Sequence, residues 1–344
     1  MGRRTGGSGG VGGSIRRTCG PYSCQADGSI ADSRWKPFQC RFSRRGRAMS
    51  NLEFVDTHVH FWDLREPTLR YTWLQPEAVH PELGEYGAIK SLCYRAADLV
   101  AETRFQNVSA VIHVQAALGI EDPVEETRWL QASADRLGAP QGIVAYVDLA
   151  SPDAAATITR HREYSNVRGV RDLRYDNYLT EPGWERGLSA LEGTGLVLCD
   201  DPLVEVMGDA AELAKRHPGV TFCVDHAGFP RRRDREYFEA WRAGMRKLAA
   251  VDSTVIKISG LAMCDHGWTV ESIRPWVEEC INAWGTKRAF FGTNWPVDRL
   301  FSSYGDVIDA YREIIRDLPH DKQVALFSGN ATRTFQLQSV ATSR

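Results

Sequence analysis

The chain has 344 residues, of which 43% are hydrophobic and 25% are charged, and this balance is typical of a globular protein with a sizeable core. No apolar run approaches the roughly 18–20 residues that a membrane-spanning helix needs, so we expect a soluble protein with no membrane partner. Residues 1–50 carry a net charge of +8 and residues 51–344 carry −10, which makes the globular part a poor candidate for binding nucleic acid.

The first fifty residues differ from the rest in composition. They contain the stretch GGSGGVGGS and the arginine cluster RFSRRGR, with no apolar segment of a secretory signal. An arginine-rich, acid-poor leader could be an organelle transit peptide, but its glycine content argues against an amphipathic helix. We therefore expect residues 1–50 to be a disordered extension, with Met49 at the start of the folded protein, and residues 51–344 to form one domain.

Cysteine usage indicates a reducing compartment. The eight cysteines are scattered, no C-x-x-C pair occurs, and Cys199 and Cys223 lie inside apolar runs. This pattern argues against a disulfide framework and against a cysteine zinc site, so we expect a cytoplasmic protein.

After residue 50, short apolar runs with β-strand character alternate with amphipathic helical patterns, for example at 123–138, 203–219 and 236–251. This alternation implies parallel pairing, and eight units over about 250 residues fit a closed (β/α)8 barrel, an α/β fold. No G-x-G-x-x-G motif follows a strand, which argues against an open doubly wound sheet. The predicted strands are 53–59, 108–116, 141–149, 167–173, 195–201, 221–227, 255–261 and 288–295.

Polar or ionisable residues stand at the end of nearly every predicted strand. In a barrel these carboxyl ends converge on one mouth, where catalytic groups are found, so we expect the active site there. The residues at these ends are His58, His60, Gln115, Asp148, Arg171, Asp172, Asp200, Asp201, Asp225, His226, Lys257, Ser259 and Asn294.

Asp56, His58 and His60 follow one another at two-residue spacing on the first predicted strand, so their side chains share a face. The pair of histidines could hold a divalent metal or bind a substrate carboxylate, and His226 would supply a third imidazole. Asp56 is expected to form hydrogen bonds in the floor of the barrel. His113, in the middle of a strand, is expected to be a core histidine.

Six motifs resemble those of the amidohydrolase-related family, and most closely its branch of sugar lactonases and pyrone-dicarboxylate lactonases. They run in order through residues 51–338, essentially the whole expected domain. Together they make the family resemblance specific, whereas an H-x-H motif alone would be weak evidence for it. The motifs are VDTHVHFWD, GVRDLRYD, VDHAGFP, KISGL, FFGTNWPVDRL and SGNATRTFQL. The resemblance implies a distorted (β/α)8 barrel that hydrolyses lactones, amides or related bonds; a zinc-dependent decarboxylase branch also exists.

The resemblance also implies roles for particular residues. It places functional positions at His58, His60, His226 and Asn294. Positions that face the substrate in lactonases correspond to the residues Gln115 and Arg171. Asp172, also a candidate for substrate binding, stands where lactonases commonly have a histidine. Three further residues are candidates for substrate binding: Lys257, which could neutralise an anionic substrate or form an ion pair with Asp225, and the flanking aromatic side chains Trp62 and Trp295.

The closing strand departs from the family pattern. Lactonases and decarboxylases carry an aspartate there, which acts as the general base and, in metal enzymes, as a ligand, whereas this chain has Asn294. An amide does not accept a proton at neutral pH and is a poor metal ligand. Asp298 is our first candidate for the base, and Asp172 or Asp200 could act from another strand. Alternatively, the water is not activated and the protein only binds its ligand.

The leading hypothesis is therefore a hydrolase that opens a small polar lactone with activated water. A metal-dependent decarboxylase and a non-catalytic binding protein are the alternatives. Either no cofactor is required or one divalent ion, zinc or manganese, is held by His58, His60 and His226. We expect a small molecule as the substrate and regard a homodimer as possible for a barrel of this kind.

Overall fold

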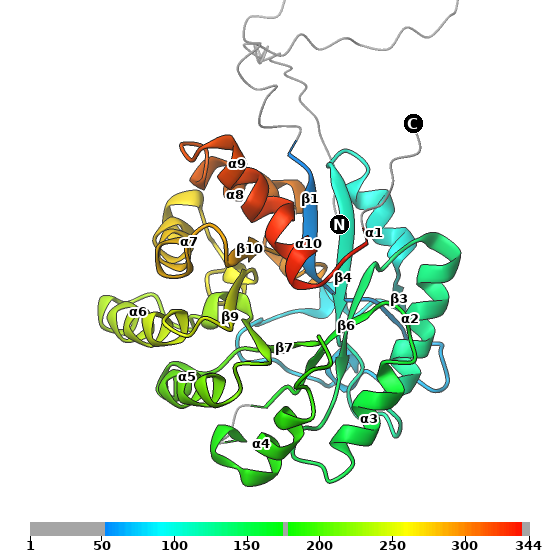
Figure 1. The fold of residues 1–344 in the computed structure, drawn as a ribbon. Coiled ribbons are helices and arrows are strands. Elements are labelled where there is room, and N and C mark those ends of the chain that lie inside the picture. The colour runs from blue at the N-terminus through cyan, green and yellow to red at the C-terminus, as the bar shows by residue number, and fades with distance from the viewer. Residues whose placement is uncertain (1–51, 175–177, 339–344) are drawn as a thin grey trace, which may run out of the picture. The chain divides into compact units, whose positions relative to one another are not determined.

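A computed structural model describes residues 52–174 and 178–338 of the chain. The predicted extension, residues 1–50, lies outside the described residues. Within the described ranges, the structure contains a barrel of parallel strands surrounded by helices (Figure 1), as the sequence predicts. No helix in these ranges is long and apolar enough to cross a membrane.

Eight parallel strands follow one another around the barrel in chain order. Each pairs with the next because an intervening helix returns the chain to the same end of the sheet. The strands are β1 (Phe54–Val59), β4 (Val108–Val114), β5 (Gly142–Tyr146), β6 (Val167–Arg171), β7 (Val197–Asp200), β8 (Thr221–Val224), β9 (Thr254–Ile258) and β10 (Ala289–Phe291). Two short strands outside the barrel, β2 (Trp62–Asp63) and β3 (Cys93–Tyr94), form an antiparallel pair.

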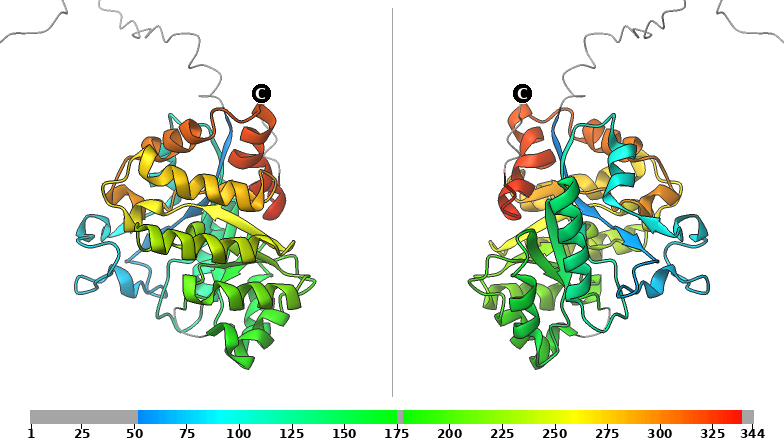
Figure 2. Two further views of the ribbon diagram at one scale, coloured as in Figure 1. Left: turned by 90° about the vertical axis from the view of Figure 1, so that its left-hand side faces the viewer. Right: turned by 90° about the vertical axis from the view of Figure 1, so that its right-hand side faces the viewer.

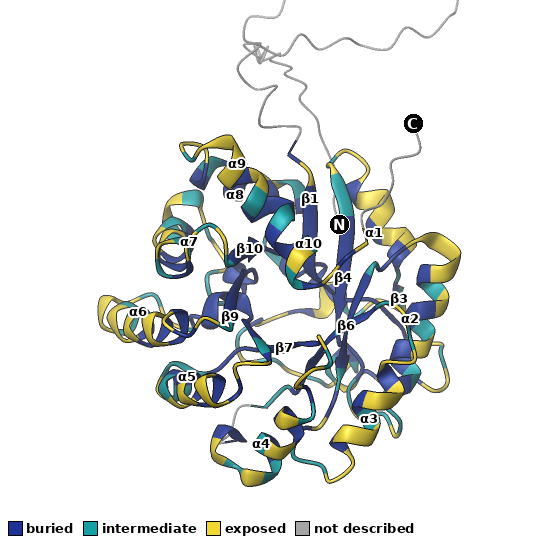
Figure 3. Ribbon diagram, viewed as in Figure 1, coloured by how far each residue is buried: buried dark blue, intermediate teal, exposed yellow. Residues whose placement is uncertain are grey.

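The helices cover the outside of the sheet, and α5, α6 and α7 lie side by side (Figure 2). Their apolar faces are buried against the strands and their polar faces are exposed (Figure 3). The helices are α1 (Ala96–Thr103), α2 (Val124–Leu137), α3 (Ala154–His161), α4 (Pro182–Ser189), α5 (Met207–Arg216), α6 (Arg235–Ala249), α7 (Val270–Trp284), α8 (Tyr304–Ile314), α9 (His320–Val324) and α10 (Asn330–Thr334).

The seam between β1 and β10 closes the barrel through a few specific contacts. Thr57 Oγ1 donates a hydrogen bond to the Phe291 carbonyl (2.7 Å), and the His60 amide donates to the Trp295 carbonyl (2.8 Å). The strands approach so closely that a Cβ on Gly292 would lie 2.9 Å from Thr57 Oγ1. A glycine is therefore required at this seam.

Asp56 ties the same seam together from inside the protein. Its buried carboxylate accepts hydrogen bonds from the Thr293 amide (2.9 Å), the Thr293 hydroxyl (2.5 Å) and the Tyr304 hydroxyl (2.9 Å). Burial raises the pKa of Asp56 to about 6, although these hydrogen bonds favour its charged form. The geometry supports the hydrogen-bonding role expected for Asp56.

The amino-terminal end of the barrel is filled by apolar side chains. Val55, Val197 and Phe290 belong to a buried cluster that also contains Phe335 and Leu337 from the segment after α10. Leu337 lies 3.3 Å from where a Cβ would stand on Gly142, the first residue of β5. Since the described residues pack this end, we expect a ligand to enter the barrel from the carboxyl ends of the strands.

Candidate active site

A cavity of about 140 Å³ opens at the carboxyl ends of the barrel strands. Its floor is polar, because the polar residues other than His80 stand at or just after the ends of the barrel strands. Its upper wall is apolar and comes from the loops. The polar wall residues are His60, His80, Gln115, Arg171, Asp201, His226 and Asn294, and the apolar ones are Trp73, Leu83, Ala116, Leu118, Leu173, Phe229, Met263 and Val297.

His58 and His60 lie together at the end of β1, with their Nε2 atoms 3.2 Å apart. His60 Nδ1 lies 2.8 Å from the Val114 carbonyl oxygen. A carbonyl only accepts hydrogen bonds, so this contact assigns the proton of a neutral His60 to Nδ1 and leaves a lone pair on Nε2. His60 lines the cavity, whereas His58 is fully buried one layer below it.

His226 joins this pair from the other side of the barrel. It begins the short 3-10 helix η6 (His226–Gly228) after β8, and its ring centroid lies 4.2 Å from that of His58. Ser259 Oγ lies 3.0 Å from His226 Nδ1 and orients the ring. Gly260 has a φ of +61°, and a Cβ there would lie 2.5 Å from His226 Nδ1, so only glycine leaves room for the imidazole.

Asn294 follows β10 and reaches the cavity from a left-handed backbone conformation, with a φ of 58°. Asparagine tolerates this conformation better than most residues, and such backbone strain is frequent at functional sites. Its Nδ2 donates a hydrogen bond to Asp298 Oδ1 (2.8 Å), which fixes the orientation of the amide.

All three imidazoles are held neutral. Burial lowers the pKa of His60 to about 3, with a further contribution from the Arg171 cation. Burial also places the pKa of His58 and that of His226 well below the usual value, and nearby positive charge adds to this effect. Neutral rings can accept hydrogen bonds or bind a metal through their lone pairs.

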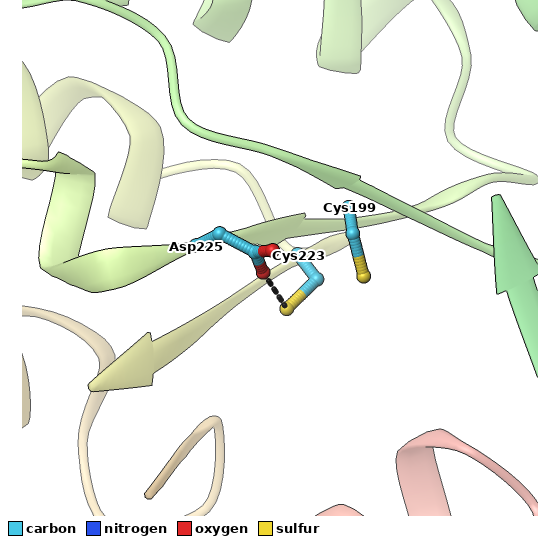
Figure 4. Close-up of side chains that lie close together, drawn as sticks. All are labelled: Cys199, Cys223 and Asp225. Carbon is cyan, nitrogen blue, oxygen red and sulfur yellow. Dashed lines mark hydrogen bonds between the residues drawn. The ribbon is translucent and has the colours of Figure 1, made fainter. Parts of the chain in front are cut away.

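Cys199, Cys223 and Asp225 form a buried cluster (Figure 4). Their possible ligand atoms lie within 4.8 Å of one another. However, Lys257 Nζ lies 2.9 Å from Asp225 Oδ1 and 3.7 Å from Cys199 Sγ. The lysine ammonium is therefore the cation that this cluster holds, and the arrangement does not favour a metal ion.

Asp225 connects this cluster to the histidines. Its Oδ2 lies 3.5 Å from His58 Nδ1, and neither atom has a hydrogen-bond partner in the structure. A buried polar atom without a partner is uncommon and requires an explanation.

Five of the residues predicted from the sequence line the cavity: His60, Gln115, Arg171, His226 and Asn294. His58 supports them from below. Trp62 and Trp295 are buried away from the cavity wall, and their indole N–H groups donate to the Ser91 carbonyl and to Glu102. Asp172, Lys257 and Asp298 are likewise buried outside the wall.

Asp201 is a wall residue that the sequence placed at a strand end without assigning it a role. It directly follows Asp200, the last residue of β7, and neighbouring residues on a strand point to opposite sides. Because the two aspartates are adjacent, one of their carboxylates is expected to face the mouth of the barrel, but the sequence does not indicate which one. In the structure it is Asp201, while Asp200 points to Tyr178 (2.5 Å).

Comparisons with known proteins agree with this architecture. The amidohydrolase family matches residues 55–337. The uncharacterized protein y4mH from Sinorhizobium fredii is 36% identical over 301 residues, which cover 84% of this chain and 100% of that protein. The L-fucono-1,5-lactonase of Burkholderia multivorans is 28% identical over 309 residues, covering 84% and 98%. A zinc-bound amidohydrolase structure from Burkholderia multivorans has a TM-score of 0.71 at 26% identity, covering 83% and 99%. The chain therefore belongs to the amidohydrolase family.

Proposed function

We propose that this protein is a hydrolase that opens a small polar lactone with water. The observation that carries the proposal is that His60 from β1, His226 from the end of β8 and Asn294 from beyond β10 meet at one cavity. The similarity to an L-fucono-1,5-lactonase supports a lactone as the substrate class. The polar floor suits the ester group of such a ring, and the apolar upper wall suits its carbon face.

The wall residues supply most of what lactone hydrolysis needs. The reaction requires a water molecule beside the carbonyl carbon and positive charge near the oxyanion that forms. Arg171 provides a permanent cation in the wall, and Gln115 provides an amide. His60 lines the cavity, and its Nε2 lies 3.2 Å from His58 Nε2, so the two rings support each other at the cavity floor. Asp298 was our first candidate for the base. Because its carboxyl group accepts a hydrogen bond from the Asn294 amide and lies outside the wall, in this proposal Asp298 orients Asn294.

The His58–His60 pair also fits a divalent ion. The Nε2 atoms are 3.2 Å apart, and the Val114 carbonyl directs the His60 lone pair toward His58. A metal on His58 Nε2 would place the proton on Nδ1, where it faces Asp225 Oδ2 and gives both atoms the partner that they lack. A bound ion would polarise the carbonyl and lower the pKa of a bound water.

Replacing Asn294 with aspartate is expected to tighten zinc binding by at least about 10-fold, because it places a carboxylate among neutral donors. In the natural chain Asp225, the carboxylate that faces His58 Nδ1, is already paired with Lys257. Competition against a chromophoric chelator measures the zinc Kd of both proteins. Adding His58→Ala to the aspartate variant should reverse the gain, and equal zinc Kd values for Asn294→Asp and the natural chain would contradict the expectation.

A panel of 1,4- and 1,5-aldonolactones, with and without an added carboxylate, tests the proposed function. Acid release followed with a pH indicator should show saturable turnover of at least one lactone, and elemental analysis of the same preparation records its metal content. Absence of turnover across the panel would overturn the proposal. Activity that arises only after Asn294→Asp would indicate that the natural chain is a binding protein.

A further inference from the structure

Hydrolysis by this site requires a proton acceptor, and the carboxylates near the barrel mouth differ in how they are placed. Among the residues that the structure describes, Asp201 is the one carboxylate that lines the cavity. It is 3% exposed and therefore largely shielded from bulk solvent.

The carboxylates next to it in sequence or along the mouth are bound to the surrounding fold. Asp172 Oδ2 accepts hydrogen bonds from the Leu149 amide (3.0 Å) and from Trp184 Nε1 (2.9 Å). Asp200 Oδ2 accepts a hydrogen bond from the Tyr178 hydroxyl (2.5 Å). Both side chains therefore point away from the cavity and stabilise the wall behind it.

Two further carboxylates, Asp225 and Asp298, are engaged deeper in the barrel. Asp225 pairs with Lys257 at 2.9 Å, and both side chains are fully buried. Asp298 accepts the hydrogen bond from Asn294, and burial raises its pKa to about 8, so it is mostly protonated at neutral pH. A protonated carboxyl group cannot take a proton from water.

Asp201 lies 3.8 Å from the Arg171 guanidinium. At this distance the guanidinium attracts the carboxylate electrostatically. The distance exceeds that of a hydrogen bond, so the guanidinium does not occupy a lone pair of the carboxylate. The other charged or titratable groups that face Asp201 are Asp200, Asp225, Arg231 and the Tyr178 hydroxyl. Burial raises the pKa of Asp201 to about 6, and the Arg171 cation limits the rise.

We propose that Asp201 is the general base of the lactone hydrolysis. The basic carboxylate then comes from the residue after β7, and the position after the closing strand is occupied by Asn294. The inference rests on the proposed function. The Asp201 carboxylate takes one proton from water while the water oxygen bonds to the lactone carbonyl carbon and the carbonyl electron pair moves to its oxygen. When this intermediate collapses, the bond to the ring oxygen breaks and the leaving alkoxide receives the proton from Asp201. One lactone and one water thus give one hydroxy acid, and the base is regenerated.

The test compares the full-length protein with its Asp201→Asn variant on a lactone that the natural chain hydrolyses. For the natural chain, kcat/KM should rise as the pH increases through about 6, because only the ionised carboxylate accepts a proton. Asp201→Asn should lower kcat/KM by about 100-fold or more and abolish that rise. Asp148→Asn is the matched control: it removes an exposed strand-end carboxylate outside the wall and should leave the rate unchanged.

Chemical rescue separates catalysis from a loss of structure. Added formate should raise the rate of Asp201→Ala by at least about 10-fold. A merely structural role of Asp201 would not allow such a rescue. Turnover by Asp201→Asn at the natural rate with the same pH profile would overturn the inference. So would a pH dependence that survives in Asp201→Asn but disappears in Asp298→Asn. If the natural chain hydrolyses no lactone, it is the proposed function that fails.

Discussion

Replacing Lys257 with methionine is expected to destabilise the fold by about 3–5 kcal/mol, because it leaves the Asp225 carboxylate buried without its counter-ion. Both side chains are fully buried, with Nζ 2.9 Å from Asp225 Oδ1. Burial alone would lower the pKa of Lys257, but the Asp225 carboxylate and the neighbouring thiols outweigh it, so the pKa stands above its usual value. Urea unfolding followed by circular dichroism measures the loss.

A double variant distinguishes this cause from a simple packing defect. Lys257→Met combined with Asp225→Asn removes both charges and should recover most of the stability that the single change loses, since a neutral pair of similar volume is tolerated in a core. Measuring Asp225→Asn alone as well completes a double-mutant cycle. If Lys257→Met by itself leaves the free energy of unfolding unchanged, the ion pair does not stabilise this barrel. A double variant no more stable than Lys257→Met would point to packing instead.

All eight predicted barrel strands occur in the structure, each shifted or shortened by a few residues. The prediction succeeds because a strand inside a barrel is buried on both sides and reads as a continuous apolar run. By contrast, β2 and β3 contain two residues each and pair across a gap of about thirty residues. Such short strands are stabilised by their tertiary contacts, and no local sequence pattern predicts them.

The alternation of side chains explains which predicted site residues reach the cavity. Arg171 lies in the wall and the next residue, Asp172, points outward to Trp184. Asn294 lies in the wall and Trp295 does not. Convergence of strand ends was therefore predictable, whereas the choice between two adjacent polar residues depends on strand register, which the sequence alone does not specify.

The apolar upper wall could not be derived from the sequence. Trp73 and Leu83 lie in the long connection between β2 and β3. Phe229 directly follows η6, and Met263 lies in a short 3-10 helix (Leu261–Cys264) after β9. The conformations of such loops depend on contacts between distant segments, for example the hydrogen bond from Trp73 Nε1 to the Ala116 carbonyl (2.7 Å). For the same reason substrate specificity is the feature least accessible from sequence.

The His60→Asn variant is expected to lower kcat/KM by about 100-fold or more while the fold is retained. An asparagine amide nitrogen can occupy the place of His60 Nδ1 and still donate to the Val114 carbonyl, which now lies 2.8 Å from that ring nitrogen. The substitution therefore removes Nε2, which lies 3.2 Å from His58 Nε2 and is a metal-binding nitrogen in the proposed function. Glutamine, whose longer side chain can return a polar atom toward the Nε2 position, should restore part of the rate.

His113 provides the matched control, because its ring centroid lies 6.4 Å from that of His60 yet it is absent from the cavity wall. Its Nδ1 accepts a hydrogen bond from the Phe61 amide (3.1 Å), and its ring stacks on Phe61. His113→Asn should therefore cost about 1–3 kcal/mol of stability and leave kcat/KM nearly unchanged. Thermal unfolding and steady-state kinetics on all the variants separate the two roles. Natural kinetics in His60→Asn, or a rate loss confined to His113→Asn, would show that the reacting atoms do not meet the end of β1.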